Sequence, residues 1–138
     1  MAATRWVERR MTGVRSASRS LMILVAGPYR SGTDDDPGRI AANMAAMNEA
    51  ALTLFRIGHL PITGEGMALP LIAAAGSRRV GDAPFHAIFH PIAELLAQRC
   101  DGCLRIGGAS AGADRMVRIL RDLDRPVWYR LEDVPPSG

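Results

Sequence analysis

The chain has 138 residues, enough for one domain, and its 17 Lys or Arg residues are all Arg. The formal net charge is +3, but residues 1–20 hold five Arg and one acid, whereas the rest of the chain holds 12 Arg and 13 acids. We therefore expect a flexible, Arg-rich leader over residues 1–20 and a nearly neutral folded body. Such a body is not expected to bind a nucleic acid polymer.

The composition also excludes several classes of protein. Hydrophobic residues make up 48% of the chain, which is typical of a globular protein and not of a disordered one. The longest apolar run, residues 21–26, is far shorter than the roughly 20 residues that a membrane span needs. Two cysteines are too few for a disulfide framework. We expect a cytoplasmic protein without a membrane partner.

The first half of the chain predicts two strands around one long helix. Residues 21–26 form an apolar run that ends at Gly27-Pro28, which is typical of a strand buried on both faces. Residues 37–58 predict an amphipathic helix, because apolar side chains recur at alternating spacings of four and three. Residues 60–63 predict a second strand. Residues 64–84 are expected to be irregular, with a short helix at 67–75.

The second half of the chain continues the alternation of strands and helices. The expected elements are a separate turn at 85–90, a helix from Pro91 to Arg99, a strand at 101–106, a glycine loop at 107–112, a helix with an apolar stripe from Ala113 to Leu120, a strand at 126–129 and a tail at 131–138. This alternation predicts one doubly wound α/β domain over residues 21–130, with a parallel sheet covered by helices on both faces.

Ligands of such sheets bind at the carboxyl ends of the strands, and the first loop there follows residue 26. In this loop Gly27 allows a close approach of the backbone, and Tyr29 offers a hydroxyl and a stacking face. Gly27 and Pro28 are both expected to bind the substrate. Arg30 can clamp a carboxylate or a phosphate. The alternative is a solvated turn in which Pro and Gly only reverse the chain.

The second loop runs from Gly107 and Gly108 through Ser110 to Gly112, at the start of a helix. Exposed N–H groups and the helix dipole make this a natural anion site. The loop matches neither the Walker A motif nor the dinucleotide-binding G-x-G-x-x-G motif. Ser110 has an alternative interpretation as the cap of the helix.

These segments together resemble the nucleoside 2-deoxyribosyltransferase-like superfamily, and in particular its small bacterial branch known as domain of unknown function 4406. The similar pieces are AGPYR (26–30), the following helix with Arg39 and Asn43, GHLPITGE (58–65), CDGCLRI (100–106), SAGAD (110–114) and RPV (125–127). The resemblance spans residues 21–130. It implies a flavodoxin-like fold and homo-oligomers that complete their sites across a subunit interface.

The resemblance also implies chemistry at C1′ of a nucleoside or nucleoside monophosphate. A carboxylate attacks the anomeric carbon while the base leaves, and water or a second base then resolves the glycosyl-enzyme. This chemistry needs no metal and no organic cofactor. The partner is thus a small molecule, and a 5′-phosphate held by the anion loop favours hydrolysis of a monophosphate.

The family's nucleophile is a glutamate, and this chain has none in the matching segment. Counted from Gly112, the matching position is Asp114; counted back from residues 126–127, it is Met116. We expect Asp114 to be the nucleophile, with Tyr29 orienting it and Glu65 acting as general acid/base or contacting the sugar. If Met116 is the true equivalent, the protein is a non-catalytic nucleotide-binding module.

Both carboxylates also have plainer interpretations: Asp114 is favoured by the helix dipole in a first turn, and Glu65 is an ordinary loop glutamate. No metal site is expected from His86 and His90, which lack a third ligand. Likewise, Asp34–Asp36 is interpreted as a solvated run, and Cys100 and Cys103 as packed thiols.

Overall fold

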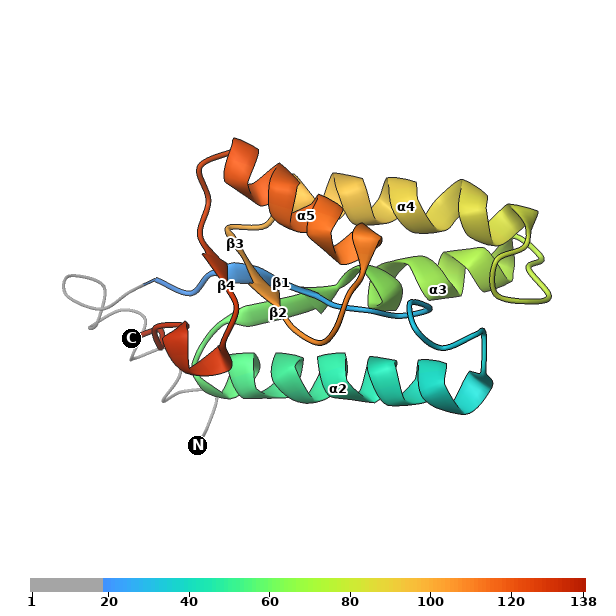
Figure 1. Cartoon of the computed structure of the whole chain (residues 1–138). Coiled ribbons are helices and arrows are strands. Elements are labelled where there is room, and N and C mark those ends of the chain that lie inside the picture. Colours follow the sequence, from blue (N-terminus) through green and yellow to red (C-terminus); the bar gives the residue numbers. More distant parts are fainter. Residues whose placement is uncertain (1–18) are drawn as a thin grey trace, which may run out of the picture.

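The computed structural model describes residues 19–138, so the expected leader lies almost entirely outside the described residues. Its centre is one parallel sheet of four strands, β1 (Met22–Ala26), β2 (Leu60–Thr63), β3 (Gly102–Arg105) and β4 (Val127–Trp128), in the order β2-β1-β3-β4 (Figure 1). This is the start of the flavodoxin-like strand order. The predicted α/β class with a parallel sheet is confirmed.

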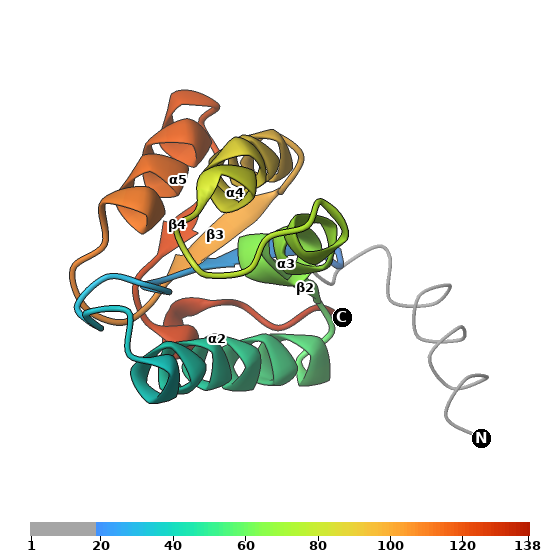
Figure 2. The same cartoon turned by 90° about the vertical axis from the view of Figure 1, so that its right-hand side faces the viewer.

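Helices cover both faces of the sheet. Helix α2 (Pro37–Arg56) lies on one face, and α4 (Ala83–Ala97) and α5 (Ala111–Asp122) lie on the other (Figure 2). Helix α3 (Gly64–Ala74) packs mainly against α4 beside the β2 edge. Because side chains alternate along β1, Ile23 and Val25 join the core under α2, while Leu24 joins the core under α4 and α5.

Helix α3 begins earlier than the sequence predicted. Thr63, the last residue of β2, is also the N-cap of α3, and its hydroxyl accepts the N–H of Gly66 at 2.9 Å. The expectation of an irregular segment was therefore wrong for residues 64–66, whereas the helix expected at 67–75 corresponds to the rest of α3 and residues 76–82 are irregular as expected. One threonine ends the strand and starts the helix, so no loop separates them.

Helix α4 corrects a second expectation, because residues 85–90 are not a separate turn. The helix starts at Ala83, with Asp82 as its N-cap, and runs through Pro91 without a break. Pro91 removes one backbone donor, but Phe85 is buried in a cluster with α3. Tertiary packing of this face holds the helix together across the proline.

The last residues pack onto the body. After a short 3₁₀ helix, Leu131–Asp133, Val134 is buried in the core on the α2 side. The Nδ1 of His59 accepts the N–H of Leu21 at 3.1 Å, so its Nε2 donates to the carbonyl of Pro135 at 2.6 Å. The N–H of Ser137 donates to the carbonyl of Ile57 at 2.8 Å. The expected tail is thus part of the packed structure.

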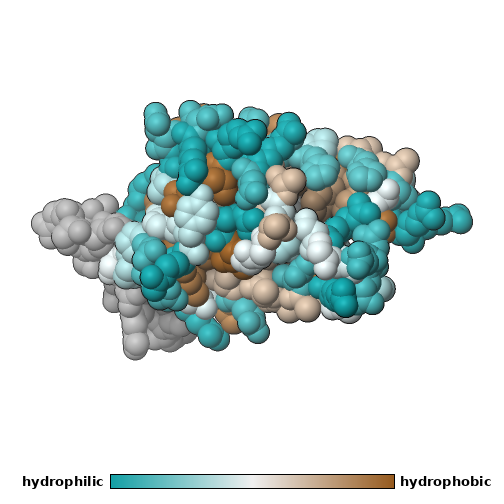
Figure 3. All heavy atoms as spheres, viewed as in Figure 1, coloured by the Kyte–Doolittle hydropathy of each residue, from teal (hydrophilic) through white to brown (hydrophobic). Residues whose placement is uncertain are grey.

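The surface over α5 is strongly polar, and on the face drawn in Figure 3 hydrophilic side chains gather there while hydrophobic ones lie between α5 and α2. No helix of residues 19–138 is both long enough and apolar enough to cross a membrane.

Candidate active site

A cavity of about 510 Å³ opens at the carboxyl ends of β1 and β3. The chain leaves β1 toward α2 and leaves β3 toward α5 on the opposite face, which is where a crevice forms in doubly wound sheets. The cavity is lined by residues 24–27, 29–32, 34, 35, 64, 65, 85, 89, 90, 93, 110–113 and 116. Its volume lies within the range of ligand pockets.

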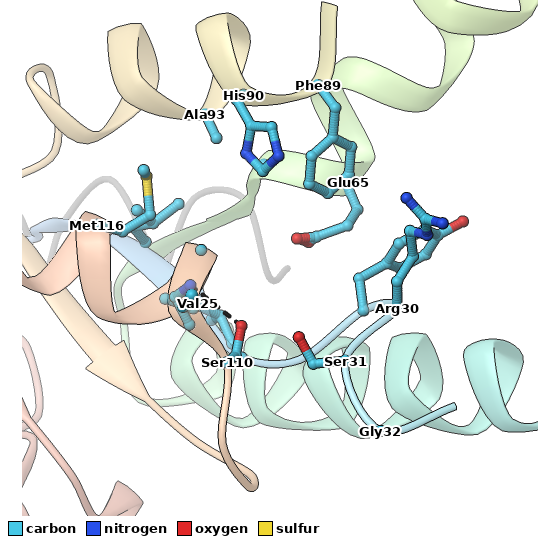
Figure 4. Close-up of a pocket in the computed structure, with 18 of the residues that line it drawn as sticks. Val25, Arg30, Ser31, Gly32, Glu65, Phe89, His90, Ala93, Ser110 and Met116 are labelled. Atoms are coloured by element: carbon cyan, nitrogen blue, oxygen red, sulfur yellow. Dashed lines mark hydrogen bonds between the residues drawn. The ribbon is translucent and has the colours of Figure 1, made fainter. Parts of the chain in front are cut away.

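Glu65 is the buried carboxyl of this cavity. It is the second residue of α3, and because Thr63 both ends β2 and caps α3, Glu65 lies two residues beyond the carboxyl end of β2. The residue is 7% exposed, and its Oε2 atom is buried without a hydrogen-bond partner in the described structure. Figure 4 shows the carboxyl group pointing into the cavity. Loss of solvation raises the pKa of Glu65 to about 7, although a backbone hydrogen bond opposes the shift. Near neutral pH the group can therefore both donate and accept a proton.

Tyr29 is part of an aromatic wall next to this carboxyl. The ring centroids of Tyr29 and Phe89 lie 5.7 Å apart, and those of Phe85 and Phe89 lie 4.8 Å apart, in stacked arrangements. Burial, and then the charge of Glu65, raise the pKa of the Tyr29 hydroxyl. The side chain of Asn43 holds the loop in place by donating to the carbonyl of Tyr29 at 3.0 Å. The wall offers a flat apolar face to a ring-shaped ligand.

Arg30 lies at the mouth of the cavity and is already paired. Its Nε and Nη2 both donate to the carboxylate of Asp35 at 2.9 Å, and this hydrogen bond lowers the pKa of Asp35. The guanidinium also lies 5.7 Å from the ring centroid of Phe85. Asp34 and Asp35 have φ values of 51° and 55°, so this turn uses the left-handed region twice.

Ser110 brings the start of α5 to the cavity. Its hydroxyl oxygen accepts a hydrogen bond from the N–H of Ala113 at 3.2 Å, which confirms that Ser110 caps helix α5. Gly112 lines the cavity as expected. Ala111 also lines the cavity, and the N–H groups of Ala111 and Gly112 have no partner within the helix, as in any first turn.

Three predicted binding residues do not line the cavity: Pro28, Gly107 and Gly108. Gly107 has a φ of 76°, and a Cβ on it would lie 2.7 Å from Cδ of Pro28. A Cβ on Gly108 would meet nothing within 4 Å, so it is Pro28 and Gly107 that pack the two loops against each other. They shape the site without touching its interior.

Asp114, the expected nucleophile, is not among the lining residues either. Its side chain is 65% exposed, and its Oδ1 accepts a hydrogen bond from Nε of Arg105 at 3.1 Å. Met116, two residues further along α5, is 5% exposed and lines the cavity (Figure 4). The structure thus brings Glu65 and Tyr29 together and leaves Asp114 apart.

His90 is a lining residue that the sequence did not assign to the site. Its imidazole points into the cavity in Figure 4 and meets the ring of Phe89 edge-on, with centroids 5.4 Å apart. The sequence did contain a signal for this face of α4, because the lining residues Phe85, Phe89 and Ala93 recur every four residues beside His90. The expected break before Pro91 separated these positions and hid their common helical face.

In comparisons with known proteins, the chain matches no family model, no curated protein and no solved structure. Function is therefore inferred from the cavity and from the resemblance described above.

Proposed function

We propose that this protein binds a nucleoside or nucleoside monophosphate in the cavity and cleaves its N-glycosidic bond. The observation that carries the proposal is the buried carboxyl of Glu65, whose Oε2 has no partner in the described structure, inside a cavity of about 510 Å³. The aromatic wall suits a stacked base, and the N–H groups at the start of α5 suit the oxygens of a sugar. The resemblance to the nucleoside 2-deoxyribosyltransferase-like superfamily supports the same ligand class.

Glu65 supplies the acid–base chemistry in this proposal. A nucleobase leaves C1′ more readily when it is protonated, and protonated Glu65 donates that proton. Water then forms the new bond to C1′ and passes a proton to the Glu65 carboxylate, so that base and free sugar are the products. Asp114 takes no part, because its carboxylate is paired with Arg105 outside the cavity.

Base release from a panel of nucleosides and 5′-monophosphates, followed by chromatography, tests the reaction. Glu65→Gln keeps the shape of the side chain and removes the acid, so release should fall by at least about 100-fold. Asp114→Asn is the matched control and should retain activity. Release that survives Glu65→Gln, or that Asp114→Asn abolishes, would contradict this mechanism.

The second candidate is a non-catalytic nucleotide-binding module. It is favoured by one specific observation: Met116 lines the cavity at one of the two positions where the resembled family implies its nucleophile. Thermal shift measurements with the same panel separate the candidates. Stabilisation by a nucleoside without any base release supports the binding module, whereas release supports the enzyme.

Assembly into homo-oligomers belongs to the same proposal and rests on the resemblance. Large exposed apolar side chains, including Phe55, Leu60 and Leu95, offer surface for such contacts. Size-exclusion chromatography with light scattering measures the assembly directly, and a monomer at every concentration would refute it.

A further inference from the structure

The charges on the cavity wall are mostly negative. Among the described lining residues, Asp34, Asp35 and Glu65 carry carboxyl groups, and Arg30 carries the guanidinium. When Glu65 is ionised, the wall therefore has three carboxylates and one guanidinium. A phosphate brought to this wall would meet more repulsion than attraction.

Arg30 is not free to offset this imbalance. Two of its N–H groups are engaged by the carboxylate of Asp35 at 2.9 Å. The guanidinium also lies against the backbone of Gly81, where an added Cβ would be 2.6 Å from Nη2. Three N–H groups of Arg30 remain for a ligand, but the carboxylate of Asp35 already balances the charge of the guanidinium, so a phosphate gains less attraction here than at an unpaired arginine.

Some of the N–H groups at the start of α5 already have a partner. Ser110 occupies the N–H of Ala113, and the carboxylate of Asp114 already lies in the first turn of the helix, near its positive end. The remaining N–H groups, those of Ala111 and Gly112, are enough for the neutral oxygens of a sugar. Two N–H groups are too few to stabilise a doubly charged phosphate beside an acidic wall.

Glu65 indicates which kind of chemical group the ligand presents to the cavity. Its Oε2 is buried without a partner, and a buried carboxyl oxygen is stabilised by a donor. The hydroxyl groups of a sugar and the N–H groups of a base are donors. A 5′-monophosphate offers these same donors, but its ionised phosphate adds only acceptors and brings further negative charge into a cavity whose wall is already acidic.

We propose that the ligand of the cavity is a nucleoside that carries no phosphate, and that the cavity discriminates against the corresponding 5′-monophosphate. This inference rests on the proposed function, because it selects between the two ligand classes named there. The acidic wall and the Arg30–Asp35 pair supply the discrimination.

Titration calorimetry on the full chain at low ionic strength and pH 8 tests the inference with adenosine, guanosine, cytidine, uridine and their 5′-monophosphates. At least one nucleoside should bind about tenfold or more tightly than its own monophosphate, because the carboxylates of the cavity wall repel the charge of the phosphate. Asp35→Asn should then reduce this preference about tenfold, because it frees Arg30 and removes one negative charge. Asparagine tolerates the positive φ at this exposed position, so the variant should fold.

Glu132→Gln is the matched control, since it removes an exposed, Arg-paired carboxylate that does not line the cavity. It should leave the preference unchanged. If the monophosphate binds as tightly as the nucleoside, or if Asp35→Asn leaves the preference intact, this inference is overturned while the proposed ligand family stands. If neither set binds, the proposed function fails and the inference fails with it.

Discussion

The Nε of Arg105 lies 3.1 Å from Oδ1 of Asp114, so the end of β3 is tied to the first turn of α5 by a buried guanidinium and an exposed carboxylate. Arg105 is 8% exposed and also donates to the carbonyl oxygens of Ile106 and Gly108. One side chain thus holds the whole loop that carries Ser110 to the cavity. Asp114 acts as its outer partner.

This geometry predicts unequal effects from the two ends of the ion pair. Arg105→Met should lower the free energy of unfolding by about 2–4 kcal/mol, because it leaves the loop carbonyls without their donor. Asp114→Asn should cost less than about 1 kcal/mol, because the carboxylate is exposed. Urea unfolding followed by circular dichroism measures both values. Equal losses in the two variants would show that the loop does not depend on Arg105 as described.

Gly107 is predicted to be intolerant of a side chain, whereas its neighbour Gly108 is not. An added Cβ at Gly107 would lie 2.7 Å from Pro28, at a φ of 76°, but at Gly108 it would meet nothing within 4 Å. Gly107→Ala should therefore destabilise the protein by about 1–3 kcal/mol, while Gly108→Ala should be nearly neutral. Thermal unfolding of the two variants gives the comparison, and similar midpoints for both would refute the close loop packing.

The raised pKa of Glu65 predicts a pH-dependent stability. Its pKa is about 7 in the folded protein against 4.5 as the ordinary value, so the folded state binds more protons between these limits. Stability should therefore fall as pH rises from about 4.5 to about 7 and then level off. Glu65→Gln removes this loss and should be more stable than the parent by about 3 kcal/mol at pH 8, with little difference at pH 4.5.

Chemical unfolding of Glu65→Gln and its parent at several pH values measures this difference. Glu132→Gln, which changes an exposed carboxylate, is the control and should show no such trend. A difference between Glu65→Gln and its parent that stays constant with pH would mean that Glu65 keeps an ordinary pKa.

The two cysteines are predicted to be unreactive in the folded protein. Both are free and fully buried, and burial raises the pKa of Cys100 to about 11 and that of Cys103 to about 12. Because the thiolate is the reactive form, a thiol reagent at pH 8 should label the native protein at least about 100-fold more slowly than the unfolded one. Rapid labelling of the native protein would point to an opening of the core under α4 and α5.

The strands were predictable because each is a short segment flanked by turn residues, and β1 is an uninterrupted apolar run. The four strands lie within one or two residues of the predicted ranges, and β1 and β3 are buried along nearly all of their length. The predictions failed at α3 and α4. Thr63 serves two elements at once, and Pro91 is tolerated because of packing, neither of which local sequence signals report.

In the candidate site, too, the sequence predicted some features and only tertiary contacts decided the others. Tyr29, Arg30, Glu65 and Ser110 were predicted from their place after strands, and all four line the cavity. The choice between Asp114 and Met116 depends on which side of α5 faces inward. The ion pair with Arg105 and the exposure of Asp114 answer that question, and both involve contacts between separate elements.

The amphipathic and apolar periods of this chain were enough to determine an α/β domain, and the excess positive charge was assigned by counting to the first 20 residues. Only the tertiary structure decided which charges meet. It pairs Arg30 with Asp35, pairs Arg105 with Asp114, and leaves the buried Oε2 of Glu65 without a partner in the described chain. The reason is physical: sequence patterns report which face of an element is apolar, whereas the environment of a charge depends on the several elements packed around it.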